Sequence, residues 1–590
     1  MEYPTLNVKQ KSRQMSDAFL GYNHNLRISE SEFYDMKNMT SDYYPVLAPR
    51  KKRGVYKDGI SATGIIAKDK LCYVDGTAFV IGDERIEMGL SYEPKNLVSM
   101  GAYVIIMPDR KYINTIKKGD EDYEQGDIDT TYTTVEDVTF TLCTLTGDTY
   151  ENAPAQDTAP VNSATGQPDN GQLWIDTSST PHTLKKYSEA NAMWVSIATT
   201  YIKITSTGIG MNFKQYDGVK LSGITAEGLT DLNSAHALWG CGADYLIVTG
   251  ILDQVTTQTV AQGAITIERK MPVMDFIVES NNRLWGCRYG ANDDGNIVNE
   301  IYACKLGDFK NWNCFMNLST DSYSVSCGTD GAFTGAITHL GYPLFFKENC
   351  MHKVYGDYPA NFQLQSTACR GVQRGSHRSM AIVNETLFYK SGGAVCAYDG
   401  SLPEEMSTAL GEIRYSDAVA GAHDNKYYIT MKDAGGIYHL FVYDTAKGMW
   451  HKQDNLYVDG FCSYMNEIYA IDHETKHIIT MLGSGTQDSE SVPWMVETGI
   501  VGMSLPDMKY ISRLLVRMSL EVGARVEISI QYDSIGDWEQ VCQMTVTNLR
   551  SFAIPVRPRR CDHFRIRIEG EGEGRIYSIT KTIEQGSDVS

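Results

Sequence analysis

The sequence predicts an all-β protein built around a β-propeller. Of its 590 residues, 52 are glycine and 36 are tyrosine, and Asn-Gly, Asp-Gly and Gly-Gly pairs separate short segments rich in Thr, Val and Ile. This pattern is typical of many short strands joined by tight turns. Hydrophobic residues make up 42% of the chain and charged residues 21%, which is a globular composition. The length predicts two to four domains, or one repeat-built domain with additions.

A strand-turn-strand unit recurs from about residue 270 onward. Taking Leu344, Leu387, Tyr428 and Ile468 as equivalent positions gives spacings of 43, 41 and 40 residues. A period near 40 residues, with several strands in each unit, is typical of propeller blades. Two earlier segments fit the same unit, at 68–83 and 100–115. We therefore expect about seven blades, within a range of six to eight.

Two irregularities of the repeat lead to specific expectations. Trp312 and Trp450 each follow an Asp-containing turn, so we expect both to lie on strands in similar places of two blades. The 60 residues between Leu284 and Leu344 exceed the period, and we assign the extra length to the loop 290–300.

Changes in composition divide the chain further. An acidic, low-complexity stretch interrupts the repeat after residue 124, and strand-like segments follow it. We interpret this region as a small β module inserted into a propeller loop. After Gly483, a polar linker leads to residues that alternate between apolar and polar, as in an antiparallel sandwich. The predicted parts are an extended N-terminal arm (1–55), the first propeller blades (56–124), an inserted small β module (125–225), the remaining blades (226–485) and a C-terminal antiparallel β-sandwich (486–590).

The zinc-protease signature H-E-x-x-H occurs from His473 to His477. In a metalloprotease this signature lies on a helix, because one helical turn points both imidazoles at the same ion. Here the flanking residues are β-branched, and the repeat places the segment in a hairpin turn. Glu497 has the spacing of a third ligand, but it lies in another strand-like segment. We interpret the match as a polar turn and predict no metal site.

Other catalytic motifs are absent from the sequence. It contains no G-x-S-x-G nucleophile elbow, no phosphate-binding P-loop and no G-x-G-x-x-G fingerprint. Asp293 and Asp294 lack the full spacing of a calcium loop, so we interpret them as part of an Asx-rich turn. Some propellers are glycosidases, which need a pair of carboxylates, but no pair stands out among 73 acidic residues. We predict that the protein is not an enzyme and has no catalytic residues and no cofactor.

Two clusters are candidate contact sites. The first is an aromatic platform in the inserted module for a glycan or another protein, although a small module also needs aromatic residues for its own core. Its members are Trp174, Tyr187 and Trp194. The second is the densest basic run, a solvated arm that is also a candidate contact for phosphate or for an acidic neighbouring subunit. Its members are Arg50, Lys51, Lys52 and Arg53.

Charge and cysteine usage restrict the classes of partner. The formal net charge of −20 argues against a protein that wraps nucleic acid, but an acidic wall suits a duplex that slides past it. The 13 cysteines are scattered and never form C-x-x-C, which predicts reduced, mostly buried thiols. No apolar run approaches about 18 residues, and the first residues lack signal-peptide features. We therefore expect no membrane span and synthesis in the cytoplasm.

The segment Phe19 to Gly54, FLGYNHNLRISESEFYDMKNMTSDYYPVLAPRKKRG, resembles the start of tail hub or nozzle proteins of tailed bacteriophages, in particular short-tailed ones. In those proteins a similar segment leads into a β-propeller. Segments 435–455 and 557–578 resemble the same class, and the inserted module resembles small modules of other virion tail proteins. The resemblance implies a ring, commonly of six copies, that lies below the portal and adaptor, extends the DNA exit channel and carries fibres or spikes.

We therefore predict a structural virion protein of the phage tail, made in the host cytoplasm. Its expected partners are other copies of itself in a hexameric ring, the portal or adaptor proteins, and tail fibre or spike proteins. Double-stranded DNA is expected to pass through the lumen without sequence-specific binding, and the N-terminal arm to pair with a neighbour's sheet. The first alternative is a receptor-binding propeller that recognises cell-surface glycan through the aromatic cluster. The second alternative is a glycosidase-like propeller enzyme.

Overall fold

The computed structural model describes residues 10–117, 119, 122–487, 491–545 and 548–586. Within these residues the chain forms β-strands and short 3₁₀-helices, and almost all strand pairs are antiparallel. The fold is therefore all-β, as predicted. No helix in this part of the chain is long and apolar enough to cross a bilayer. The chain divides into two compact units, one formed by 1–97, 345–351 and 366–590 and the other by 98–344 and 352–365.

Seven sheets among the described residues follow the order of a propeller blade, in which consecutive strands lie side by side. This strand order confirms the propeller architecture. The number of blades in a closed ring stays a prediction. The sheets are β6–β9 (62–87), β10–β13 (96–127), β27–β30 (276–326), β31–β34 (335–368), β35–β38 (381–405), β39–β42 (416–452), and β43–β45 (458–480) with β5 (54–57) and β46 (486–487).

The positions taken as equivalent in the repeat all fall on the second strand of a blade. Each of the four side chains is at most 3% exposed. The period of the sequence therefore marks the strand that carries the apolar core of each blade. The positions are Leu344 in β32 (Tyr342–Lys347), Leu387 in β36 (Thr386–Lys390), Tyr428 in β40 (Lys426–Lys432) and Ile468 in β44 (Glu467–Asp472).

The expectation that Trp312 lies on a strand was wrong. It lies in the long connection between β29 (Ile297–Ala303) and β30 (Tyr323–Ser326). Its side chain is only 3% exposed, and its indole N–H donates to the Phe309 carbonyl at 2.8 Å. A buried tryptophan can thus fill the core without strand pairing. The same connection, and not the loop 290–300, holds most of the residues that lengthen the repeat.

The inserted region is larger than its predicted range of 125–225. Strand β13 (Gln125–Asp127) pairs with β12 of a blade, whereas β26 (Thr266–Arg269) pairs with β14 (Thr130–Thr133). The insertion therefore runs from about 128 to 269. We expected residues 226–269 to belong to the blades, whereas the pairing partners of these strands place them in the insertion. The insertion contains the sheets β14-β26-β21-β22, β23-β24-β20-β15-β25 and β16-β17-β18-β19 (155–196).

The C-terminal region is a β-sandwich, as predicted. Its two sheets have the strand orders β1-β53-β48-β51 and β2-β47-β52-β49-β50. Alternate residues of β48 (Lys509–Leu520), from Leu514 onward, and of β49 (Arg525–Tyr532) point into one shared core. The side chains that the alternation predicted to be buried are at most 3% exposed: Leu514, Val516, Met518, Leu520, Val526, Ile528 and Ile530.

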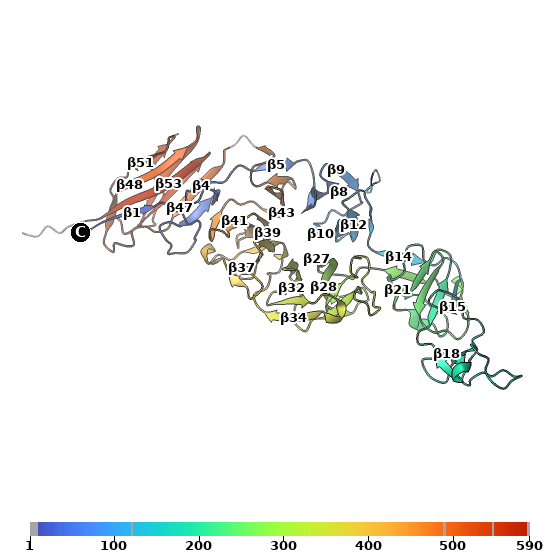
Figure 1. Cartoon of the computed structure of the whole chain (residues 1–590). Helices are drawn as coiled ribbons and strands as arrows, with labels where there is room; N and C mark the ends of the chain where they lie inside the picture. Colours follow the sequence, from blue (N-terminus) through green and yellow to red (C-terminus); the bar gives the residue numbers. More distant parts are fainter. Residues whose placement is uncertain (1–9, 118, 120–121, 488–490, 546–547, 587–590) are drawn as a thin grey trace, which may run out of the picture. The chain divides into compact units, whose positions relative to one another are not determined.

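The N-terminal arm is built into sheets of its own chain, whereas we expected it to pair with a neighbouring subunit. Figure 1 shows β1 in the sandwich, where it lies beside β53, the strand between it and β48. The physical reason is that the arm covers sheet edges that would otherwise expose unpaired backbone groups. The arm pairs β1 (Lys11–Ser16) with β53 (Gly574–Gln585), β2 (Phe33–Lys37) with β47 (Pro493–Thr498), and β5 (Gly54–Lys57) with β45 (Ile478–Thr480) and β46.

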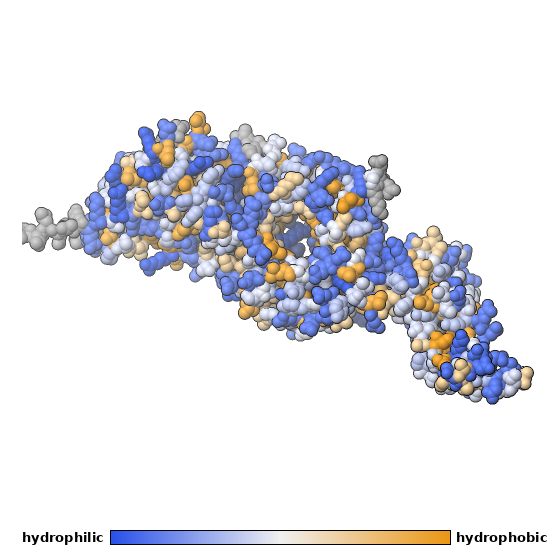
Figure 2. All heavy atoms as spheres, in the orientation of Figure 1, coloured by the Kyte–Doolittle hydropathy of each residue, from blue (hydrophilic) through white to orange (hydrophobic). Residues whose placement is uncertain are grey.

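The face of the molecule drawn in Figure 2 is mainly polar. Figure 2 shows hydrophilic residues over most of the face drawn, with hydrophobic residues in small scattered groups. Isolated apolar side chains of this kind are normal on a protein surface. The 13 cysteines are free thiols, each buried or half-buried, in line with the burial predicted for them.

Candidate functional site

Two of the four basic residues predicted as a contact site, Arg50 and Arg53, form ion pairs with a carboxylate of the same chain. Arg50 Nη2 lies 3.1 Å from Asp454 Oδ2, and Arg53 reaches both carboxylate oxygens of Asp454, at 2.7 and 2.9 Å. Arg50 Nε also donates to Asn38 Oδ1 at 2.8 Å. Asp454 lies two residues after the last strand of a blade, β42 (Met449–Lys452). This arginine clamp, formed by Arg50, Arg53 and Asp454, therefore fastens the arm to the propeller.

The clamp is shielded from water but remains charged. The side chains of Arg50, Arg53 and Asp454 are 11, 15 and 21% exposed. Burial alone would raise the pKa of Asp454, but the positive charges and hydrogen bonds of Arg53 and Arg50 lower it to about 2. Burial and the charge of Arg53 lower the pKa of Arg50 to about 10, which leaves it protonated at neutral pH. Both arginines are thus committed to Asp454 instead of phosphate, and Lys52 is half-buried beside them in the chain.

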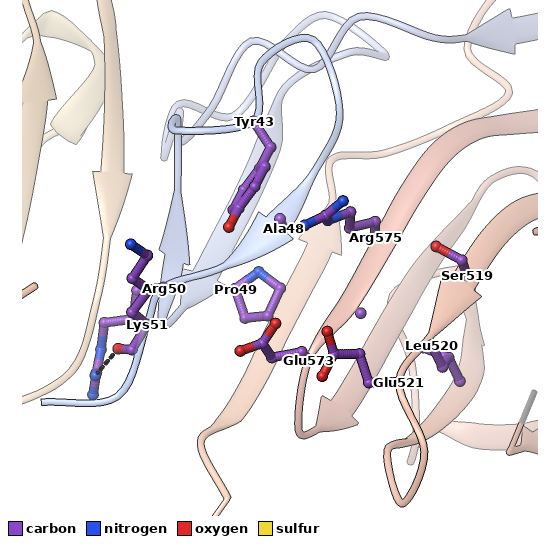
Figure 3. A pocket seen from close by; sticks show the side chains of 11 residues that line it. Tyr43, Ala48, Pro49, Arg50, Lys51, Ser519, Leu520, Glu521, Glu573 and Arg575 are labelled. Carbon is purple, nitrogen blue, oxygen red and sulfur yellow. Dashed lines mark hydrogen bonds between the residues drawn. The ribbon is translucent and has the colours of Figure 1, made fainter. Parts of the chain in front are cut away.

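Lys51 is exposed and lines a cavity of about 210 Å³ between the arm and the sandwich. Figure 3 shows Glu521 and Glu573 close together on one side of this cavity, with Tyr43 and Arg575 on another. The Arg575 guanidinium lies 4.5 Å from the centre of the Tyr43 ring. Burial, together with the charge and hydrogen bond of Glu521, raises the pKa of Glu573. The cavity is therefore lined by two carboxylates that repel one another and by three cations, Arg50, Lys51 and Arg575.

The H-E-x-x-H segment forms the predicted turn between β44 (Glu467–Asp472) and β45 (Ile478–Thr480). The two histidines have separate partners. His473 Nδ1 lies 2.6 Å from Asp459 Oδ1, whereas His477 Nε2 accepts the backbone N–H of Gly59 at 3.3 Å. The segment lacks the helical turn that would direct both imidazoles at one ion.

The other candidate metal ligands also have partners in the protein. Glu497 is buried on β47 and forms ion pairs with two arginines, of which Arg567 lies at 2.7 Å. Asp294 pairs with Lys220, and Asp293 Oδ2 accepts the Val273 backbone N–H at 3.2 Å. In the part of the chain that the structure describes, no group of three or more His, Cys, Asp or Glu residues is arranged to hold a metal.

The aromatic residues of the inserted module do come together. Trp174 on β17 (Leu173–Asp176) is 6% exposed, and its indole N–H donates to the Gln156 carbonyl at 2.9 Å. Trp194 is half-buried and packs edge-to-face against Trp174 and Tyr187, with ring centres 5.4 Å apart in each pair. Trp174 therefore belongs to the core of the module, and only Trp194 and Tyr187 retain surface for a platform.

A cavity of about 360 Å³ lies among blade strands β6 (Ala62–Ala67), β39 (Ser416–His423) and β43 (Val458–Tyr464). Asp459 is the one carboxylate among its described lining residues. It accepts hydrogen bonds from His473 and, at 2.5 Å, from the Lys476 ammonium. Glycoside hydrolysis by the usual mechanism needs two carboxylates on opposite sides of the bond, and this cavity presents one that is already paired.

Sequence reasoning missed the acidic partners of the basic run. Asp454 lies 404 residues from Arg50, and Glu521 and Glu573 belong to the sandwich, so no local pattern connects them with the arm. The one available signal in the sequence was the basic run 50–53 itself. In a chain of net charge −20, a dense basic segment favours contact with acidic groups of the same chain.

Comparison with known proteins gave structural likenesses alone. No family model matches the sequence, and no curated protein matches it. Among solved structures, BamB from Moraxella catarrhalis shares 9% identity with a TM-score of 0.24, covering 54% of this chain and 84% of BamB. PorZ, a surface component of the type-IX secretion system of Porphyromonas gingivalis, shares 12% identity with a TM-score of 0.25, covering 91% and 81%. A GH43 glycoside hydrolase shares 8% identity with a TM-score of 0.18, covering 53% and 99%.

Proposed function

We propose that this chain is a structural subunit of a bacteriophage tail. In this proposal, copies of the chain form a ring-shaped nozzle or hub, of six subunits, that extends the DNA exit channel below the portal and adaptor. The outside of the ring anchors fibres or spikes. The resemblance of residues 19–54 to the entrance segment of tail hub proteins gave this hypothesis.

The observation that carries the proposal is the path of the N-terminal arm. Between residues 11 and 57 the chain adds strands to both sheets of the sandwich and to the last blade of the propeller. The arginine clamp adds a largely buried ionic contact to Asp454, which follows the preceding blade, β39–β42. Separating the sandwich from the blades would therefore break strand pairs and expose apolar side chains. Such bracing suits a subunit that bears load during genome ejection more than one that performs chemistry.

The charge of the chain fits the same role. A net charge of −20 opposes stable binding of DNA phosphates, because neutralising contacts would need a surplus of Lys and Arg. A duplex therefore passes an acidic wall without being retained.

Immunogold labelling tests the proposal directly. Antibody raised against the purified chain is applied to particles from an induced or infected culture, and the particles are viewed by negative-stain electron microscopy. We expect gold at the tail, immediately below the capsid, in particles that also contain portal protein. Pre-immune serum on the same grids is the control. Gold on cell envelopes or on free protein, with bare tails, would refute the structural role.

A further inference from the structure

The inserted region contains a cavity that is separate from the aromatic cluster. It has a volume of about 490 Å³ and lies where the small sheet β16–β19 meets the five-stranded sheet that contains β15 (Val138–Cys143). This volume is within the range of small-molecule sites, which often form where two packed elements meet. It is lined by Leu142, Thr149, Tyr150, Asn152, Ile175 and Leu252 to Val255, with Ala153 and Pro154.

The cavity and the aromatic cluster lie on different faces of β17. Successive side chains of a strand point to opposite faces of its sheet. Trp174 belongs to the aromatic cluster, whereas the next residue, Ile175, lines the cavity and packs into the core of the inserted region. Binding at one of these surfaces is therefore separable from binding at the other by mutation.

The cavity combines an apolar floor with polar groups at its rim. The floor side chains Leu142, Ile175 and Leu252 are 6, 1 and 7% exposed, and the half-buried ring of Tyr150 packs against the same core. This floor is an apolar surface on which the less polar face of a ligand, the one that carries C–H groups, can pack. Aromatic and aliphatic side chains of this kind bind the less polar face of a sugar ring.

Three polar groups of the rim are not used by the protein. Among the described residues, the side-chain amides of Asn152 and Gln254 and the Tyr150 hydroxyl have no hydrogen-bond partner. Asp253 uses one carboxylate oxygen, Oδ1, to bind His182 Nδ1 at 2.8 Å, which fixes the side chain and leaves Oδ2 for a ligand. Amides both donate and accept hydrogen bonds, as do sugar hydroxyls.

We infer that this cavity binds a neutral saccharide. The apolar floor matches a sugar face, the convergent amide, hydroxyl and carboxylate groups match its hydroxyls, and the volume fits one or two sugar rings. No Lys or Arg is among the described lining residues, and Asp253 is one of them. An anionic ligand such as phosphate or an acidic sugar would therefore be repelled.

The test uses the purified full-length chain on an array of oligosaccharides. The array carries neutral glycans with terminal glucose, galactose or N-acetylglucosamine, and acidic glycans with sialic or uronic acid. We expect binding to neutral glycans, followed by titration calorimetry with the strongest one. The double variant Asn152→Ala/Gln254→Ala should weaken this binding at least about tenfold, since it removes two rim groups. Gln167→Ala removes an exposed amide outside the cavity and should leave binding unchanged.

A second variant separates the cavity from the aromatic platform. Trp194→Ala removes the exposed part of the platform, and a thermal melt checks that the protein remains folded. Loss of binding in Trp194→Ala, with binding kept in the double variant, would overturn the inference in favour of the platform. Binding to acidic glycans alone, or to none, would also overturn it. The labelling experiment stays informative in either case, because tail location does not depend on this cavity.

Discussion

Replacing Asp454 with Asn removes the charge that holds Arg50 and Arg53 while keeping the size of the side chain. The pKa of Asp454 is about 2 in the folded protein against an ordinary value of 3.8. At 1.36 kcal/mol per pKa unit, this difference corresponds to about 2.5 kcal/mol of stabilisation. The variant also leaves two mostly buried guanidinium groups without a counter-charge. We expect the arm contact to lose about 2–3 kcal/mol at pH 7.

The assay is amide hydrogen exchange of strand β5, Gly54–Lys57, measured by mass spectrometry. This strand follows Arg53 directly, so its local opening reports the loss of the clamp. A loss of about 2.5 kcal/mol corresponds to roughly 60-fold faster exchange. Because the folded pKa of Asp454 is depressed, its stabilisation is complete above about pH 4 and is lost as the pH falls toward 2. The wild type and the variant should therefore converge in acid.

The matched control is Asp83→Asn. Asp83 pairs with Lys57 of the same strand at 2.9 Å, but its side chain is 88% exposed. A pair so exposed to water contributes little, so we expect less than about a threefold change in exchange. Equal exchange in the wild type and in Asp454→Asn, or equal effects of both substitutions, would refute the argument that burial gives the clamp its strength.

Three further predictions concern the cavity between the arm and the sandwich, the inserted module and the turn at His473. Glu573→Gln should raise the melting midpoint by about 1 °C at pH 8 and leave it unchanged at pH 4. The reason is that the pKa of Glu573 is raised, so that its ionisation destabilises the folded protein as the pH rises through that pKa. A larger gain at pH 4 than at pH 8 would contradict repulsion between Glu573 and Glu521. Trp174→Ala should destabilise the small module by about 3 kcal/mol, since it empties a buried site. Limited proteolysis near residue 160 should show this, and resistance equal to that of the wild type would place Trp174 outside the core. His473→Ala should leave the zinc content of the purified chain, measured by plasma mass spectrometry, at the level of the wild type. Stoichiometric zinc that disappears in this variant would restore the metalloprotease reading.

The sequence determined the class of fold because each blade repeats the same local requirements. A buried second strand needs apolar residues between turn residues, and this need recurs with every blade, as at Leu387 and Tyr428. The alternation that buries Leu514 and Val516 in the sandwich is likewise visible in a short stretch of sequence, because neighbouring residues of a strand face opposite sides of the sheet. The turn at His473 was also predictable, since its β-branched flanks and its place in the repeat both exclude a helix.

Only the tertiary structure decided how the candidate sites are used. Arg50 and Arg53 looked like a free basic arm, but they pair with Asp454, about 400 residues away. Trp174 looked like a platform residue but fills the core of its module. The end of the inserted region followed from strand partners, which residue patterns do not specify. Periodicity records which face of a segment is buried, whereas contacts between distant segments depend on how the chain returns on itself.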